Sequence, residues 1–127
     1  MRYLGVDYGD AKVGLAIGDD SFFLASPYKV IRYKTWPGLF DVLLPVLTRE
    51  GIERIVVGLP MSDDERSGNQ IKKVQDFITE LKTKTKLPLV TYDEAMSTQQ
   101  ARKLTSNKND DDVAAMVTLQ AYLDGLR

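Results

Sequence analysis

The sequence predicts an α/β fold in which a mixed β-sheet is covered by helices on both faces. Two short apolar segments near the N-terminus are separated by turn residues, and three further strand-like segments follow. Later strand-like segments alternate with segments whose apolar residues recur at helical spacing. A hairpin followed by such alternation is typical of a mixed sheet between two helical layers. At 127 residues, the chain is expected to form a single domain over residues 1–127.

The first half of the chain is expected to form antiparallel strands and one helix. Three segments have the pattern of strands: Tyr3–Asp7, Val13–Ile17 and Phe22–Arg32. Gly9 lies in the first turn, and Pro27 predicts an edge strand or a bulge. Thr35 is expected to cap a helix that is kinked at Pro45 and ends at Gly51.

The second half is expected to alternate strands with helices. Ile55–Val57 has the character of a buried central strand, Leu87–Tyr92 that of the last strand, and Met61–Gly68 that of a polar loop. A helix is predicted by one apolar stripe: Ile71, Val74, Ile78 and Leu81. Three elements complete the chain: a short helix capped by Ser97 and Gln100, a loop over Ser106–Asp112 and a helix over Val113–Leu126.

Composition excludes several kinds of chemistry. The chain has no cysteine and no histidine, which excludes disulfides, thiolate ligands, His-based triads and the usual zinc sites. The N-terminus enters a strand pattern rather than a signal peptide, and no apolar run is long enough to span a bilayer. We therefore expect a cytoplasmic protein with no membrane role. The net charge of −1 is unlike that of a protein that coats nucleic acid, unless bound divalent ions supply positive charge locally.

Acidic residues follow the predicted strands at places where they can converge. Asp7 ends the first strand, Asp93 and Glu94 follow the last strand, and Asp110–Asp112 precede the terminal helix. In sheets of this kind, ligands bind beyond the carboxyl ends of the parallel strands. Mg²⁺ and Mn²⁺ prefer oxygen ligands, and a pair of such ions activates water for attack on phosphorus. Three separated acids therefore predict a metal site for phosphodiester hydrolysis.

Each acid also has a simpler explanation. Asp7 before Gly9 can act as a turn former, and Asp93 and Glu94 can be exposed acids before a helix. Helix capping and the helix dipole explain the Asp110–Asp112 run without any metal.

Four motifs, in order along nearly the whole chain, resemble the YqgF (RuvX) family. They are LGVDYGDAKVGLAIGD (Leu4–Asp19), VVGLP (Val56–Pro60), DEAMST (Asp93–Thr98) and DDVAAMVTLQAYLD (Asp111–Asp124). The resemblance implies an RNase H-like fold with a five-stranded sheet of order 3-2-1-4-5. It also implies a metal-dependent nuclease for 5′-end maturation of pre-16S ribosomal RNA, related to Holliday-junction resolvases.

The resemblance also assigns residues. The catalytic, metal-binding places fall on three acids, which would hold Mg²⁺ or Mn²⁺: Asp7, Glu94 and Asp111. Supporting places fall on Asp93, Asp112, Gly9 and Gly14. The candidates for nucleic-acid contact are Lys12, Arg66, Arg102 and Lys108. Two positions depart from the family pattern: Ala95 replaces an arginine that could contact phosphate, and Glu65 replaces a glycine.

Several functions remain open from the sequence. Structured ribosomal precursor RNA is the first substrate expected, for a monomer or a homodimer. Four-way DNA junctions are the second, and they require a homodimer that cuts two strands. A non-catalytic ribosome-assembly factor would keep the fold and dock onto a partner. A nucleotide-phosphate-binding module, of the kind found in actin, Hsp70 and sugar kinases, would use backbone amides near Gly9.

Overall fold

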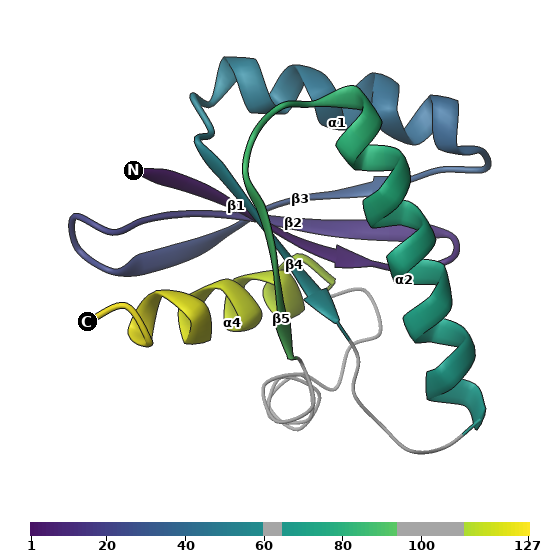
Figure 1. Ribbon diagram of the computed structural model, residues 1–127. Coiled ribbons are helices and arrows are strands. Elements are labelled where there is room, and N and C mark those ends of the chain that lie inside the picture. The colour runs from purple at the N-terminus through teal and green to yellow at the C-terminus, as the bar shows by residue number, and fades with distance from the viewer. Residues whose placement is uncertain (60–64, 94–110) are drawn as a thin grey trace.

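The computed structural model describes residues 1–59, 65–93 and 111–127, with only the backbone for residues 65–69. These residues form five strands and three helices (Figure 1). The strands are β1 (Arg2–Tyr8), β2 (Lys12–Asp19), β3 (Leu24–Arg32), β4 (Arg54–Leu59) and β5 (Leu89–Asp93). The helices are α1 (Trp36–Arg49), α2 (Glu65–Lys84) and α4 (Asp111–Asp124).

All five strands join one sheet of order β3-β2-β1-β4-β5, which confirms the order that the family resemblance implied. β1 pairs antiparallel with β2 and parallel with β4, and β4 pairs parallel with β5. The carboxyl ends of β1, β4 and β5 therefore meet at one edge of the sheet. β3 is an edge strand, and its register with β2 shifts between Leu15 and Ala16, opposite Pro27. This irregularity confirms the role predicted for Pro27.

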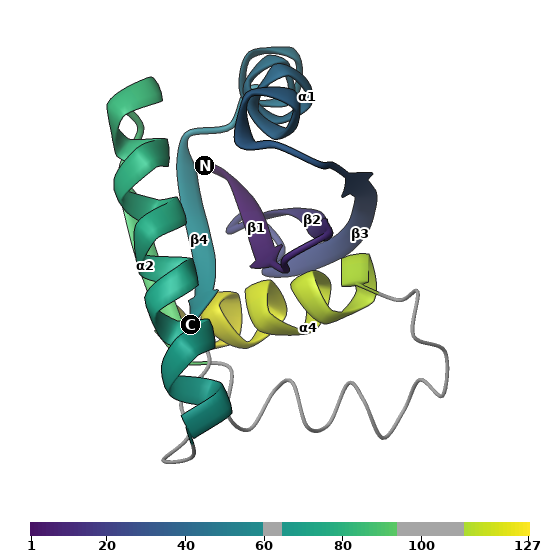
Figure 2. The ribbon, with the colours of Figure 1, turned by 90° about the vertical axis from the view of Figure 1, so that its right-hand side faces the viewer.

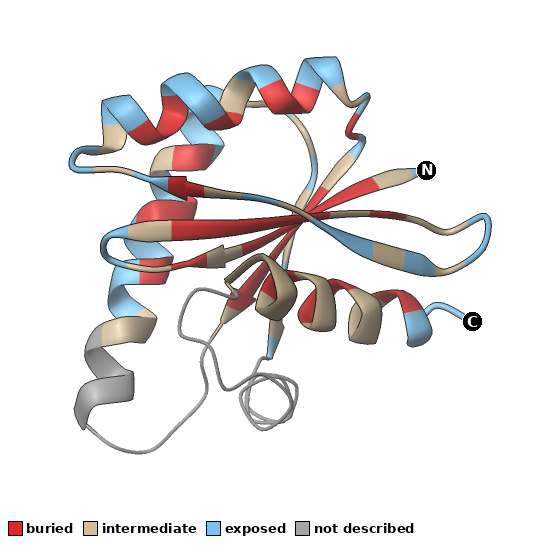
Figure 3. Cartoon of the chain, turned by 180° about the vertical axis from the view of Figure 1, so that it is seen from behind, coloured by how far each residue is buried: buried red, intermediate tan, exposed pale blue. Residues whose placement is uncertain are grey.

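The sheet separates two apolar cores. Leu4, Val6 and the alternate residues of the neighbouring strands pack against α1 and α2. Tyr3, Ala16 and Val56 point the other way and pack against α4, through Ala115, Leu119 and Leu123. Figure 2 shows α4 lying across the face opposite α1, and Figure 3 shows that the strands in the middle of the sheet are buried along most of their length. Helices on both faces are thus confirmed.

A glutamine on α4 fixes the turn between β2 and β3. The amide of Ala25 donates a hydrogen bond to Gln120 Oε1 at 2.9 Å, and Gln120 Nε2 donates to the carbonyl of Phe23 at 2.6 Å. This turn differs from the prediction, because β3 begins at Leu24 rather than Phe22. Asp19 Oδ1 accepts hydrogen bonds from the amides of Ser21 and Phe22, and Phe23 has a left-handed φ of 54° that ends the strand ladder.

The boundaries of α2, α4 and β5 differ from the predictions. The predicted loop over Met61–Gly68 is wrong in its second part, because α2 already begins at Glu65. One glycine costs a helix only about 1 kcal/mol, and the buried residues further along α2 offset that cost. α4 includes Asp111 and Asp112, which were expected in a loop, and it ends at Asp124 rather than Leu126. β5 starts at Leu89, two residues later than expected.

The first helix agrees with the prediction at its end and differs at its start. Gly51 has a φ of 63°, the left-handed conformation that a helix-ending glycine supplies. Thr35 occupies the N-cap position, but its side chain makes no capping hydrogen bond. The predicted short helix at Ser97 and Gln100 lies outside the described residues. No helix in the described ranges is both long and apolar enough to span a membrane.

Candidate catalytic site

Asp7 lies near the carboxyl end of β1, the central strand of the sheet. Tyr3 and Gly5 face α4, so strand alternation places the side chain of Asp7 on the same face. Asp7 is half-buried, and it lies directly opposite Gly14 of β2. The face that carries Asp7 is therefore the face on which α4 begins.

Gly14 allows the first residue of α4 to lie against the sheet. A Cβ atom on Gly14 would lie only 2.0 Å from the carbonyl oxygen of Asp111 and 2.8 Å from the amide nitrogen of Asp112. Any other residue would push the start of the helix away from the strand. Since Gly14 is the cross-strand neighbour of Asp7, this contact brings Asp7 and Asp111 to one place from positions far apart in sequence.

The carboxylate of Asp111 faces a cation. Lys12 Nζ lies 3.2 Å from Asp111 Oδ2, and the two side chains are 25% and 29% exposed. The same Oδ2 atom is buried and has no hydrogen-bond partner among the described residues, so the ammonium is at ion-pair distance without hydrogen-bond geometry. A buried carboxylate oxygen of this kind is suited to a divalent cation, because hard cations prefer such ligands.

The neighbouring acids lie differently. Asp112 Oδ1 accepts a hydrogen bond from the amide of Val113 at 2.9 Å, so its side chain is engaged with the first turn of α4. Asp93 is exposed and pairs with Leu59, whose side chain packs on the α1 and α2 face. Alternation along β5 therefore places Asp93 on the opposite face from Asp7.

Part of the predicted site lies outside the described residues. This holds for Glu94, Arg102 and Lys108, and the side chain of Arg66 is not described either. Over the ranges that the structure does describe, no group of three acidic side chains gathers as a metal site. The convergence of Asp7 and Asp111 with Glu94 stays a prediction.

Arg32 is a candidate that sequence reasoning missed. It is exposed at the end of β3 and pairs directly with Lys12, so both side chains project from the α4 face. The cationic pair thus lies on the same face as Asp7 and Asp111. The sequence does not reveal this position, because the bulge at Pro27 changes the register of β3. Only the observed strand pairing shows that Arg32 lies opposite Lys12.

The turn between β1 and β2 is held from two sides. Tyr33 donates a hydrogen bond to the carbonyl of Gly9, and burial, together with a hydrogen bond to Tyr8, raises the pKa of Tyr33 above its ordinary value. On the other side, Gln70 of α2 donates to the carbonyl of Tyr8, and Lys73 pairs with Asp10 at 3.0 Å. At Gly9 itself, a Cβ atom would lie 2.7 Å from the carbonyl oxygen of Lys12.

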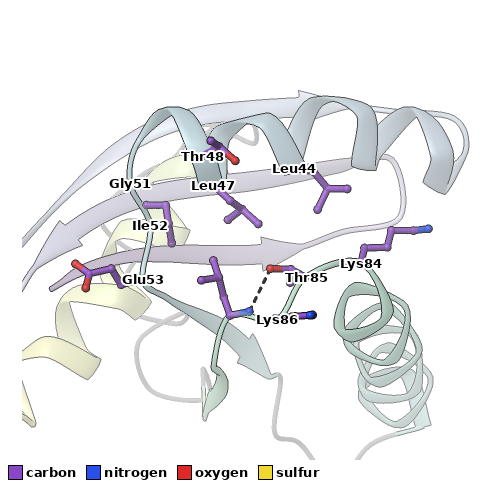
Figure 4. A pocket seen from close by; sticks show the side chains of 10 residues that line it. Leu44, Leu47, Thr48, Gly51, Ile52, Glu53, Lys84, Thr85 and Lys86 are labelled. Carbon is purple, nitrogen blue, oxygen red and sulfur yellow. Dashed lines mark hydrogen bonds between the residues drawn. The ribbon is translucent and has the colours of Figure 1, made fainter.

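A separate pocket lies at the opposite edge of the sheet. It has a volume of about 620 Å³ and is bounded by the end of α1, the loop before β4 and the loop before β5 (Figure 4). Leu47, Ile52 and Lys84 are among its lining residues. Because it is located at the amino ends of β4 and β5, it is not part of the site around Asp7.

Two solved structures of Holliday junction resolvases are similar to this chain in fold. RuvC of Thermus thermophilus in complex with a Holliday junction matches 99% of this chain and 95% of its own, with a TM-score of 0.65 and 15% identity. The fowlpox virus resolvase in complex with Holliday junction DNA covers 99% of both chains, with a TM-score of 0.57 and 18% identity. The chain therefore has the RNase H-like fold of these two proteins.

Sequence comparison identifies the family. Residues 1–125 match the RuvX family, described as a Holliday junction resolvase. A relative from Desulforamulus reducens is 36% identical over 98% of this chain and 97% of its own length, and one from Halothermothrix orenii is 34% identical over 98% and 95%. Both relatives carry the name "Putative pre-16S rRNA nuclease". The chain belongs to the RuvX family, which confirms the resemblance found in its motifs.

Proposed function

We propose that the chain is a nuclease that hydrolyses nucleic-acid phosphodiesters with divalent metal bound by Asp7, Glu94 and Asp111. The observation that carries the proposal is the contact at Gly14, which brings Asp111 beside the cross-strand neighbour of Asp7. Family membership and the names of the relatives support hydrolysis of nucleic acid. Mg²⁺ or Mn²⁺ held there would activate water and stabilise the leaving oxygen.

The chain's own side chains have separate roles in this proposal. Asp7 and Asp111 supply carboxylate oxygens from a rigid strand and from the first turn of a helix, so their positions are fixed before substrate arrives. Lys12 and Arg32 supply positive charge for the phosphate backbone on the same face. Two such cations beside the acids explain how a chain of net charge −1 attracts a polyanion at one place.

The substrate we favour is structured precursor RNA at the 5′ end of 16S ribosomal RNA, which the relatives' names indicate. A substrate of this kind, together with the absence of cysteine, suits the cytoplasm. Four-way DNA junctions are the second candidate, because the family description and the solved structures name them. Symmetrical cleavage of a junction requires two copies of the chain, so this candidate requires a homodimer.

The experiment incubates the purified chain with Mg²⁺ or Mn²⁺ and three substrates: precursor 16S RNA with its 5′ extension, single strands and four-way junctions. Asp7→Asn is expected to lower cleavage at least about a hundredfold, since even groups that only support metal ligands contribute 10- to 100-fold. Asp10→Asn is the matched control, because Asp10 is an exposed acid in the same turn. Full metal-dependent cleavage by a folded Asp7→Asn variant would contradict the proposal.

A further inference from the structure

The ion pair between Lys12 and Asp111 points to a role for Lys12 at the proposed metal site. We propose that the Lys12 ammonium neutralises Asp111 before a divalent cation binds, and that it is displaced from this carboxylate when the cation arrives. This inference rests on the proposed function, because it assumes that Asp111 is a metal ligand. The inference adds that the metal ion replaces the Lys12 ammonium as the cation beside Asp111.

The carboxylate has the properties that such an exchange requires. Asp111 Oδ2 is buried, lies 3.2 Å from Lys12 Nζ and accepts no hydrogen bond from the described residues. A partly buried carboxylate without an opposing charge is unfavourable, so the ammonium stabilises the helix start before metal binds. Because no donor among the described residues is directed at this oxygen with good geometry, its lone pairs remain suited to a stronger cation.

Lys12 can leave without disturbing Asp111. The backbone of Asp111 is held in place by its contact with Gly14, and this contact does not involve Lys12. Lysine carries its charge on a flexible four-carbon stem, so the ammonium can move by side-chain rotation alone. Lys12 is the cross-strand neighbour of Arg32 on the α4 face, so after it leaves the carboxylate the ammonium can contact a substrate phosphate there.

A second ion pair next to the same turn provides the comparison. Lys73 and Asp10 are 3.0 Å apart, but their side chains are 52% and 61% exposed, about twice as exposed as those of Lys12 and Asp111. Exposed pairs of this kind contribute little, and this one does not involve a candidate metal ligand. Lys73→Met therefore removes a similar pair while leaving the carboxylates of the site as they are.

The test measures Mn²⁺ binding by isothermal titration calorimetry to the full chain, without nucleic acid. Lys12→Met removes the competing charge and keeps the stem, so the affinity for Mn²⁺ is expected to rise roughly two- to fivefold, the equivalent of one partly exposed ion pair. The metal-free variant is expected to melt at a lower temperature than wild type and to gain more from Mn²⁺. Lys73→Met is expected to leave both quantities unchanged, and Lys12→Gln repeats the test with a polar side chain.

Two results would overturn the inference. Unchanged or weaker Mn²⁺ binding by both Lys12 variants, with binding by wild type that Asp7→Asn abolishes, would remove the exchange and leave the proposed metal site in place. No Mn²⁺ binding by wild type would remove the metal site and the exchange together. Thus the two failures are distinguishable within one set of titrations.

Discussion

The exposed side chain of Arg32 is a candidate for nucleic-acid contact because of its position in the pairing of β3 with β2. It lies opposite Lys12, on the face that carries Asp7 and Asp111. Lys29, three residues earlier on the same strand, pairs with Leu15, whose side chain packs into the core on the other face. The two cations are therefore expected to differ in their contribution to nucleic-acid binding.

Arg32→Gln is predicted to weaken binding of RNA or DNA and to lower the salt dependence of the affinity by about one released counterion. Lys29→Gln is the control and is expected to change neither. Filter binding or fluorescence anisotropy over a range of salt concentrations measures both quantities. An equal loss for the two variants would mean that Arg32 has no special place on the binding face.

Tyr33→Phe tests how the turn beside Asp7 is held. At pH 7 we expect the free energy of unfolding to fall by about 0.5 to 1.5 kcal/mol, because the hydrogen bond to the Gly9 carbonyl disappears. The pKa of Tyr33 is raised in the folded chain, so its stabilisation is present below the unfolded value of 10.0 and is lost as the pH rises above that value. The difference in melting temperature between wild type and Tyr33→Phe should therefore shrink from pH 8 to pH 11. A constant difference would contradict this assignment.

Among the elements, the placement of α4 on β2 matters most for the site. Its first residue lies against Gly14, and its apolar face packs on Tyr3, Ala16 and Val56. The helix therefore positions Asp111 through backbone contact rather than through a chain of side chains. A change at Gly14 should affect stability and activity together.

Gly14→Ala is predicted to destabilise the fold by at least about 1 to 3 kcal/mol, because the added methyl group overlaps the carbonyl of Asp111. Gly38→Ala is the control: among the described residues, a Cβ there meets only Thr35 Oγ1 at 3.7 Å, and a helical alanine is expected to stabilise by about 0.5 to 1 kcal/mol. Denaturant unfolding gives both values. The prediction is wrong if Gly14→Ala unfolds at the same denaturant concentration as wild type.

Whether a segment forms a helix or a strand was predictable where the local sequence pattern decides it. The first and last residues of several elements were not predictable. The stripe of Val74, Ile78 and Leu81 identified α2, and Gly51 marked the end of α1. The start of α2 was misplaced because local glycine and serine favour a loop, whereas packing of the distant apolar stripe on the sheet stabilises the helix. Phe22 was wrongly assigned to a strand. It lies in a turn held by a hydrogen bond from its amide to the side chain of Asp19, and the apolar pattern does not reveal that bond.

At the scale of the whole molecule, the sheet gathers the candidate chemistry at one edge and leaves the pocket near Leu47 at the other. Asp7 and the Asp110–Asp112 run were predictable as candidates because acids follow a strand and precede a helix, and the family resemblance singled out Asp111. The adjacency of Asp7 and Asp111 was not predictable from spacing, because it depends on which strand face α4 covers. The face of the sheet on which Asp93 lies was not predictable either, because it follows from the pairing of Asp93 with Leu59.

The most direct test is the anomalous scattering of a crystal of this chain soaked in Mn²⁺. We predict a manganese peak within ligand distance of the carboxylates of Asp7 and Asp111, with Glu94 as a further ligand, and no such peak in Asp7→Asn. Carboxylates of Asp7 and Asp111 that share no ion, or manganese bound only elsewhere, would contradict metal-dependent catalysis at this edge of the sheet.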